Sequence, residues 1–201
     1  MLLAIDTSAG TSVAVVDRER GIITEHSSDD TRRHAEVIGQ LIAACLGDWG
    51  GVVTDLSGVA AGMGPGPFTG LRVGIAAARA FAFGAGIPVV AVVSHDAIAF
   101  GSAEPSIVVT DARRHEVFWS TYAPTDATGL PPRTAGPNLA KADELDTLGL
   151  RILNPGRVSA GALGMVAELQ YAHGVPMAAD EAIYLRSPDV TLSAGPKRVT
   201  S

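Results

Sequence analysis

The sequence predicts an α/β protein in which a mixed sheet is flanked by helices, and two observations within the first 95 residues lead to this class. The first is a series of short apolar runs bounded by glycines or charged residues, which is typical of β-strands. The second is a pair of longer segments in which apolar residues recur at helical spacing. In chain order, strands are expected at residues 2–6, 12–17, 21–26, 57–63 and 87–93, and helices at 34–46 and 70–83. Three strands followed by alternating helices and strands indicate a mixed sheet.

Local signals predict where the two helices begin and end. Apolar residues of the first helix fall three or four positions apart, and Gly47 is its expected stop. The second helix follows a glycine-proline turn, and Thr69 is its expected N-cap, with Phe68 and Val73 forming a hydrophobic staple across the cap. The strand at 87–93 is apolar nearly throughout, which is typical of a strand buried on both faces.

The second half of the chain is less regular. Residues 107–111 and 116–122 flank a short turn and predict a hairpin. The proline-rich segment 124–137 is expected to be a loop. Ser159 is the expected cap of a third helix.

Composition limits the classes of partner. Of the 201 residues, 47% are hydrophobic, and the formal net charge is −6. An acidic chain repels phosphate backbones, and the basic clusters Arg32-Arg33 and Arg113-Arg114 are short, so we expect another subunit to hold any nucleic acid. The longest apolar stretch, residues 80–93, is too short to span a membrane. Asp6 interrupts the N-terminal apolar run and the chain has a single cysteine, so we expect a soluble cytoplasmic protein without a signal peptide.

Residues 62–72 form a glycine-proline turn between an expected strand and an expected helix. The glycines permit positive φ angles and close backbone approach, and the prolines stiffen the turn. One interpretation is an anion site at the helix N-terminus, aided by Arg72. The turn lacks the Gly-Lys-Ser/Thr of a Walker loop. The alternative is a rigid structural turn, and the residues alone leave both interpretations open.

Two further turns offer candidate chemistry. After the first expected strand, Asp6, Thr7, Ser8 and Ser12 could hold a metal-bound phosphate, or they could form a hairpin stabilised by an Asx-turn. The turn at 111–116 supplies an acid and two cations, either for a catalytic group or for a solvated turn. The five histidines show no pair at helical spacing, so no helical metal clamp is expected.

A nine-residue segment carries a specific resemblance to a known family. The chain has Gly64-Pro65-Gly66-Pro67-Phe68-Thr69-Gly70-Leu71-Arg72, which resembles the signature Gly-Pro-Gly-Ser-Phe-Thr-Gly-Leu-Arg of the TsaB (YeaZ) family with Pro67 in place of serine. Four other segments agree in the same order, so the resemblance covers nearly the whole chain. They are Ala4-Ile5-Asp6-Thr7-Ser8, His34 at the start of the first helix, Asp111-Ala112-Arg113 with Glu116-Val117, and Tyr184-Leu185-Arg186.

The resemblance implies an actin/sugar-kinase/Hsp70-like (ASKHA) fold of two related lobes. Residues 1–95 would form the N-terminal lobe with the partner-binding helices, 96–187 a reduced C-terminal lobe, and 188–201 a flexible tail. Family members are dimerisation subunits that pair with a larger catalytic homologue, TsaD, and an ATPase, TsaE, joins them. The complex transfers a threonylcarbamoyl group to the adenosine 3′ of the tRNA anticodon. We therefore expect tRNA to meet this chain only through the complex, and no cofactor of its own, while nucleotide binding in the complex stays open.

Comparison with the catalytic relative indicates that this chain is not an enzyme. The relative has a Val-x-His-x-x-x-His segment whose two histidines hold a metal, whereas this chain has His95 at the first position and Ala99 at the second. One imidazole cannot replace a two-histidine clamp. A small-molecule kinase or ATPase of the same fold is the alternative, but it would need a glycine-rich adenosine motif that we do not find after residue 100. A stand-alone peptidase would need a nucleophile and a base that the sequence does not assemble.

The two helices independently predict a partner. Charges within 70–83 are limited to Arg72 and Arg79, and Gln40 is the one strongly polar side chain within 37–46. A helix that is apolar nearly all round must be buried nearly all round, yet a two-layer lobe covers only one face. A second subunit would cover the other face, namely the catalytic homologue or, for the chain alone, a second copy; a third layer within a monomer is the alternative. The expected interface residues are Val37, Ile38, Leu41, Ile42, Cys45, Leu71, Gly74, Ile75, Ala77 and Ala78.

Overall fold

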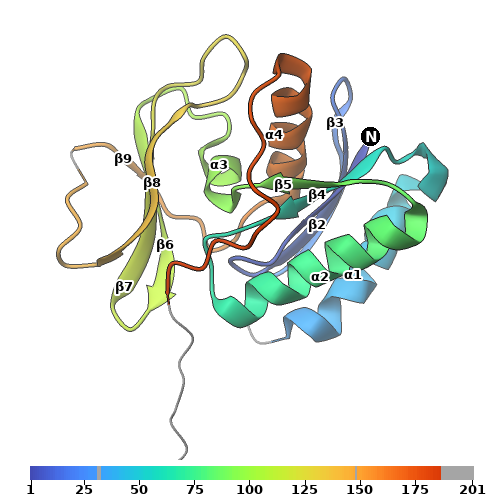
Figure 1. Cartoon of the computed structure of the whole chain (residues 1–201), viewed down its shortest axis with the longest axis horizontal. Helices are drawn as coiled ribbons and strands as arrows, with labels where there is room; N and C mark the ends of the chain where they lie inside the picture. Colours follow the sequence, from blue (N-terminus) through green and yellow to red (C-terminus); the bar gives the residue numbers. More distant parts are fainter. Residues whose placement is uncertain (31–32, 148, 187–201) are drawn as a thin grey trace, which may run out of the picture.

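Two sheets form the frame of the computed structural model, which describes residues 1–30, 33–147 and 149–186 (Figure 1). The first sheet has the strand order β3-β2-β1-β4-β5. Because β1 pairs antiparallel with β2 and parallel with β4, the sheet is mixed, and the predicted α/β class is confirmed. The strands are β1 (Leu2–Asp6), β2 (Thr11–Asp17), β3 (Gly21–Ser28), β4 (Gly58–Gly62) and β5 (Val89–Val92).

Helices cover both faces of the first sheet (Figure 1). Side chains of β1 alternate between the two faces, and all five residues of the strand are buried. Leu3 and Ile5 pack into the core shared with α1 and α2, whereas Leu2 and Ala4 pack into the core shared with α4. These helices are α1 (His34–Trp49), α2 (Phe68–Ala85) and α4 (Ala160–His173), and a short 3-10 helix, Val53–Asp55, precedes β4.

The second sheet is smaller, with the order β8-β7-β6-β9. Helix α3 packs against β6 and β7, and a small core of Ala99, Val108 and Tyr122 lies between them. These elements are α3 (Ser94–Ala99), β6 (Ser106–Arg113), β7 (Glu116–Tyr122), β8 (Arg133–Lys141) and β9 (Arg151–Leu153). Within the described part of the chain, no helix is long and apolar enough to cross a membrane.

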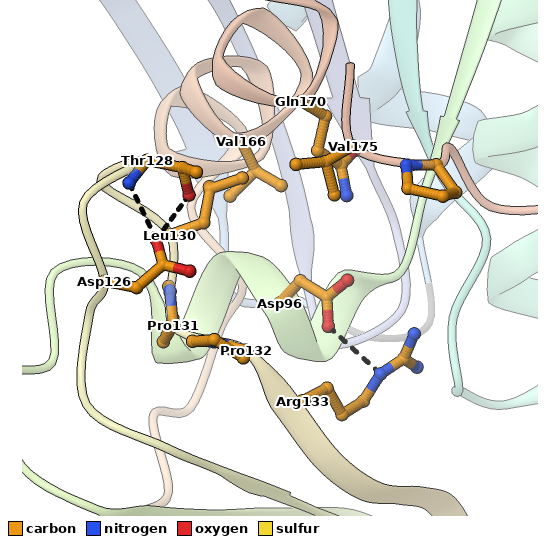
Figure 2. A pocket seen from close by; sticks show the side chains of 11 residues that line it. Asp96, Asp126, Thr128, Leu130, Pro131, Pro132, Arg133, Val166, Gln170 and Val175 are labelled. Carbon is orange, nitrogen blue, oxygen red and sulfur yellow. Dashed lines mark hydrogen bonds and ion pairs between the residues drawn. The ribbon is translucent and has the colours of Figure 1, made fainter. Parts of the chain in front are cut away.

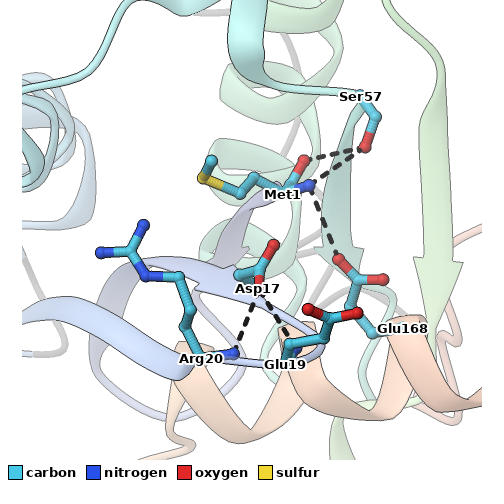
Figure 3. Close-up of polar contacts among 6 residues, drawn as sticks. All are labelled: Met1, Asp17, Glu19, Arg20, Ser57 and Glu168. Carbon is cyan, nitrogen blue, oxygen red and sulfur yellow. Dashed lines mark hydrogen bonds and ion pairs between the residues drawn. The ribbon is translucent and has the colours of Figure 1, made fainter.

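After the second sheet the chain returns to the first. Helix α4 falls in the segment expected to form the second lobe, but it packs against β1 and β2 of the first sheet. Its Glu168 lies 3.8 Å from the N-terminal ammonium of Met1, whose carbonyl accepts a hydrogen bond from Ser57 Oγ at 2.9 Å (Figure 3). The division of the chain at residue 95 stays a prediction, and the expected tail, 188–201, lies outside the described residues.

Segment 175–186 runs from α4 back across the first sheet and then reaches the second. Ala178 N donates to the carbonyl of Ala91 at 3.2 Å, and Ile183 N donates to the carbonyl of Met63 at 2.8 Å. This segment therefore covers the free edge of β5 and reaches the signature turn. We call it the C-terminal strap.

The helix ends differ from those expected. α1 continues through Gly47 to Trp49 and ends at Gly50, which has a φ of 69°. A left-handed residue is needed only at the end of the helix, so Gly47 can stay within it. The N-cap of α2 is Pro67, two residues before the expected cap Thr69, and the helix begins at Phe68. Thr69 therefore lies in the first turn, and the predicted staple of Phe68 across a Thr69 cap is wrong.

The proline-rich segment was expected to be a loop, but residues 133–137 belong to β8. β8 is at the edge of its sheet, where Pro137 leaves no interior ladder hydrogen bond unmade. The predicted hairpin is confirmed as β6 and β7, and the predicted cap of α4 is confirmed because Ser159 Oγ accepts a hydrogen bond from Ala162 N at 3.0 Å.

Candidate functional site

Two of the candidate segments, the turn after β1 and the signature turn before α2, pack directly against each other. A Cβ at Gly66 would lie 2.8 Å from the carbonyl oxygen of Ser8, and one at Gly70 would lie 2.7 Å from that of Thr7. Real side chains do not fit at these distances, so both glycines are required by close backbone approach. The rigid-turn interpretation accounts for these signature positions.

Thr7 connects the two segments through hydrogen bonds. Its Oγ1 donates to the carbonyl of Gly70 at 2.7 Å and accepts from the backbone N–H of Gly74 at 3.0 Å. The N-terminal half of α2 is thereby fixed to the end of β1.

Asp6 is the centre of a buried polar cluster. Its Oδ1 accepts hydrogen bonds from Ser8 N at 2.8 Å and Ser8 Oγ at 2.6 Å, and its Oδ2 accepts from Ser94 Oγ at 2.5 Å. Ser94 Oγ in turn accepts from Gly64 N at 3.1 Å. Burial raises the pKa of the Asp6 carboxyl, and the bonds from Ser8 and Ser94 oppose that shift. The cluster joins β1, the signature turn and α3.

The hydroxyl group of Ser12 is also hydrogen-bonded within the protein. It donates to Glu25 Oε1 at 2.8 Å and accepts from Ala160 N at 3.1 Å, so it helps to seat the start of α4. All four candidate phosphate residues are buried, with Ser8 the most exposed at 6%. Their hydroxyl and carboxylate oxygens bond within the protein, which favours the hairpin alternative. The phosphate interpretation stays a prediction.

The hairpin of β6 and β7 carries three other signature residues, Asp111, Arg113 and Glu116. Arg113, Arg114 and His115 all have positive φ angles, and Asp111 Oδ1 accepts a hydrogen bond from Arg113 N at 2.8 Å. Asp111 and Arg113 are exposed, which agrees with a solvated turn. Glu116, at the start of β7, is half-buried.

The C-terminal strap brings the last signature segment to both of the others. Arg186 donates to the carbonyl of Ala112 at 2.8 Å and lies 3.6 Å from Glu116 Oε2. Tyr184 packs on Phe68 with ring centroids 4.9 Å apart, and the Arg72 guanidinium lies 4.0 Å from the centre of the Phe68 ring. Segments far apart in the sequence are therefore joined, and the contacts link the two sheets.

His95 does not fit a metal site. Its side chain is buried, with Nδ1 2.8 Å from Ser120 Oγ and Nε2 2.9 Å from Thr110 Oγ1. Both ring nitrogens are thus engaged, and Ala99, where a second histidine would be needed, is buried as well. Burial lowers the pKa of His95 to about 3, so the ring is neutral at physiological pH. The residue fixes α3 to the second sheet.

The partner interface expected from the sequence needs correction. Each helix packs both on the first sheet and on the other helix, and this packing buries within the chain six of the ten residues expected at the interface. Val37, Leu41, Ile42 and Ala77 are half-buried, and the last three pack against the core beneath the helices. The remaining six residues are buried within the chain: Ile38, Cys45, Leu71, Gly74, Ile75 and Ala78.

Other residues face solvent on these helices, and we call them the outward face of α1 and α2. The face is built mainly from small side chains, and Phe83 near the end of α2 is 91% exposed. Aromatic residues are enriched in protein–protein interfaces, and Phe83 is the most exposed large hydrophobic residue in the described part of the chain. The outward face comprises Ala35, Glu36, Gly39, Gln40, Ala43, Gly47 and Asp48 on α1 and Thr69, Arg72, Ala76, Arg79, Ala80, Phe83 and Gly84 on α2.

One pocket was not predicted from the sequence, because residues from three segments far apart in the sequence form its walls. It lies between α3, α4 and the loop before β8, and Asp96, Arg133 and Gln170 are its central polar residues (Figure 2). The available signal was Gln170, a polar residue on the buried stripe of α4 that also carries Leu163 and Val166.

A family model of TsaD, tRNA N6-adenosine threonylcarbamoyltransferase, matches residues 7–171. An uncharacterized protein of Mycobacterium tuberculosis is 38% identical over 200 residues, covering 94% of this chain and 92% of that protein. The tRNA threonylcarbamoyladenosine biosynthesis protein TsaB of Escherichia coli is 34% identical over 126 residues, covering 60% of this chain and 54% of TsaB.

A solved structure gives the same result for the fold. It is that of an uncharacterized protein with similarity to the peptidase YeaZ from Pseudomonas aeruginosa. It superimposes with a TM-score of 0.75 at 25% identity, covering 92% of this chain and 99% of the other. The ASKHA-like fold predicted from the resemblance is confirmed.

Proposed function

The chain belongs to the TsaD family, within its TsaB (YeaZ) group, and we propose on that basis that it is a scaffold subunit for tRNA threonylcarbamoyladenosine synthesis. It would pair with a larger TsaD-type homologue, and a TsaE-type ATPase would join the pair. tRNA would be bound through the complex, and the chain would act in the cytoplasm, where tRNA is modified.

The observation that carries the proposal is the outward face of α1 and α2. Both helices lie side by side on one face of the sheet (Figure 1). The C-terminal strap contacts the edge of this face on α2, where Asp180 pairs with Arg79, and it leaves Gly39, Ala43, Ala80 and Phe83 exposed. Small residues such as Gly39, Ala43 and Ala80 would let the helices of a homologue approach closely, and Phe83 would be covered by it.

The non-catalytic part of the proposal is supported by His95 and Ala99. Both ring nitrogens of the histidine form hydrogen bonds with hydroxyl groups of the second sheet. The side chain therefore stabilises the core and is not free to act on a substrate. The polar cluster around Asp6 is likewise turned inward. A small-molecule kinase or ATPase would need these groups open to a nucleotide.

Reconstitution tests the proposal. Threonylcarbamoyl transfer to tRNA should be absent with this chain alone, and it should require this chain when the TsaD-type homologue and the TsaE-type ATPase are present. Transfer by the chain alone would contradict the non-catalytic role. Undiminished transfer by the other two proteins without it would contradict the scaffold role. Single-turnover assays with threonylcarbamoyl adenylate labelled in its threonine, and with unmodified tRNA, measure both.

A further inference from the structure

The pocket between α3 and α4 is separate from the signature turn and from the outward face of α1 and α2. It has a volume of about 280 Å³. This is close to the lower end of the range for ligand sites, roughly 300–1,000 Å³, so an occupant must be small. Its walls are mainly apolar, formed by Leu130, Pro131, Val166 and Val175 (Figure 2). The few polar groups among them decide which class of molecule fits.

Gln170 presents an unused donor to the pocket. Its side chain descends from α4 with the amide nitrogen, Nε2, turned toward Asp96 (Figure 2). The residue is 7% exposed, and its side chain makes no hydrogen bond within the described part of the chain. Its Oε1 is buried out of reach of a ligand, whereas Nε2 faces the space of the pocket. The pocket therefore offers one amide N–H that has no acceptor.

Asp96 presents an unused acceptor on the opposite wall. Both of its contacts use Oδ1, which accepts from the Tyr122 hydroxyl at 2.8 Å and lies 3.5 Å from Arg133 Nε. Its other oxygen, Oδ2, points up toward Gln170 (Figure 2). Burial raises the pKa of Asp96, and the Arg133 charge opposes that shift. Because no hydrogen bond joins Asp96 to Gln170, a donor and an acceptor face each other across the pocket.

From this arrangement we propose that the pocket binds a small alcohol, a molecule with one hydroxyl group on an apolar body. The hydroxyl oxygen accepts from Gln170 Nε2, and its hydrogen donates to Asp96 Oδ2, so one atom satisfies both groups. The body packs on Val166, Val175 and the proline wall. Since water can make the same two bonds, the affinity comes mainly from burial of the apolar body.

Other polar groups fit this pair less well. An ether oxygen accepts from Gln170 but has no hydrogen for Asp96. An ammonium group donates to Asp96 but cannot accept from Gln170, and it lies near the Arg133 charge. A carboxylate is repelled by Asp96 and by Asp126 at the rim, and a carboxamide would set its carbonyl oxygen against the Asp96 carboxylate.

The test uses benzyl alcohol, benzyl methyl ether and benzylamine, which share one apolar body and differ in the polar group. In chemical-shift titrations of the full chain, benzyl alcohol should bind with a dissociation constant of about 1 mM, near Val166, Gln170 and Val175. The ether and the amine should each bind about tenfold more weakly, because each leaves Asp96 or Gln170 without its partner. Equal or tighter binding of either would overturn the proposal, as would no saturable binding of benzyl alcohol.

Two variants and a matched control locate the site. Gln170→Leu should weaken binding of benzyl alcohol about fivefold, because it removes the donor. Asp96→Asn replaces the free acceptor by an N–H donor, so the preference for the alcohol over the ether should disappear. Gln40→Leu makes the same change as Gln170→Leu at an exposed position of α1 and should leave binding unchanged.

Thermal melts separate these effects from damage to the fold. Gln170→Leu should melt at or above the wild-type temperature, because it removes the unpaired buried Oε1. Asp96→Asn bears on the fold through Tyr122 and Arg133, so Gln170→Leu decides alone if that variant unfolds. A folded Gln170→Leu that binds benzyl alcohol with wild-type affinity would overturn the proposal.

Discussion

The polar cluster around Asp6 and the outward face of α1 and α2 differ in a way that the sequence conceals. The cluster combines the Asp6 carboxylate with the hydroxyl groups of Ser8 and Ser94, yet it is closed to solvent and its oxygens bond one another. The outward face is built mainly from small side chains, with charged residues such as Glu36, Arg72 and Arg79 among them; it is open, and its Phe83 is almost fully exposed. A polar cluster therefore stabilises the fold from within, while a surface of mainly small residues is the one that we propose for a partner.

The difference teaches that residue type alone does not assign role in this fold. Asp6 follows a first strand and precedes a hydroxyl-rich turn, the pattern expected for a phosphate loop, but it fixes α3 and the signature turn to the sheet.

Asp6→Ala should lower the free energy of unfolding by about 3 kcal/mol, because it leaves donors of Ser8 and Ser94 without an acceptor in the core. Urea denaturation followed by circular dichroism measures it. Asp17→Ala is the matched control, since Asp17 accepts two backbone bonds in an exposed turn, and its effect should be far smaller. Wild-type stability of Asp6→Ala would mean that the cluster is not structural.

Acid should weaken the fold through His95. Its pKa is lowered to about 3 in the folded protein, so below its ordinary value of 6.5 the unfolded chain takes up a proton that the folded chain excludes. Stability from this group is full above pH 6.5 and falls as the pH drops toward 3, by about 1.4 kcal/mol per unit.

The comparison variant is His95→Gln, which does not titrate. The difference in unfolding free energy between wild type and variant should shrink by roughly 2–3 kcal/mol between pH 7 and pH 4.5. The raised pKa values of Asp6 and Asp96 act in the opposite direction in both proteins and cancel in the difference. Parallel curves would show that His95 is protonated in the fold.

Gly39→Ala should separate stability from association on the outward face. Gly39 lies within α1 with open space around its Cα, so alanine should stabilise the free chain by about 0.5–1 kcal/mol. The added methyl group should weaken binding of the TsaD-type homologue several-fold if the helices approach closely there. Thermal melts and calorimetric titration measure the two effects, and tighter binding by the variant would contradict a close helix contact at Gly39.

Much of the fold could be predicted because the spacing of apolar residues and the positions of turn and cap residues agree over long stretches. The hairpin at 107–122 and the cap at Ser159 are examples. Prediction failed where the tertiary structure places a residue in an element that its type usually disfavours. Pro137 lies in a strand because β8 is an edge, and Gly47 stays helical because Gly50 ends α1.

The candidate site could be predicted only in part. The signature marked residues that meet in space, such as Phe68 with Tyr184 and Glu116 with Arg186. The direction of each helix face could not be predicted, because a helix with alanines at 76, 77, 78, 80 and 82 has no amphipathic pattern to orient it. Burial against Thr7 and the sheet, which only the structure shows, decides that Ala78 is inside and Ala80 outside.

The central claim is that the outward face of α1 and α2 binds the TsaD-type homologue, and Ala80→Arg tests it most directly. Ala80 is exposed, so the variant should melt like the wild type, whereas its affinity for the homologue should fall about a hundredfold or more, because an arginine at a close helix contact buries an unpaired charge. Ala78→Arg, about 200° away around the helix, should unfold the chain and serves as the inward control. A folded Ala80→Arg that binds the homologue with wild-type affinity in calorimetric titration would contradict the account.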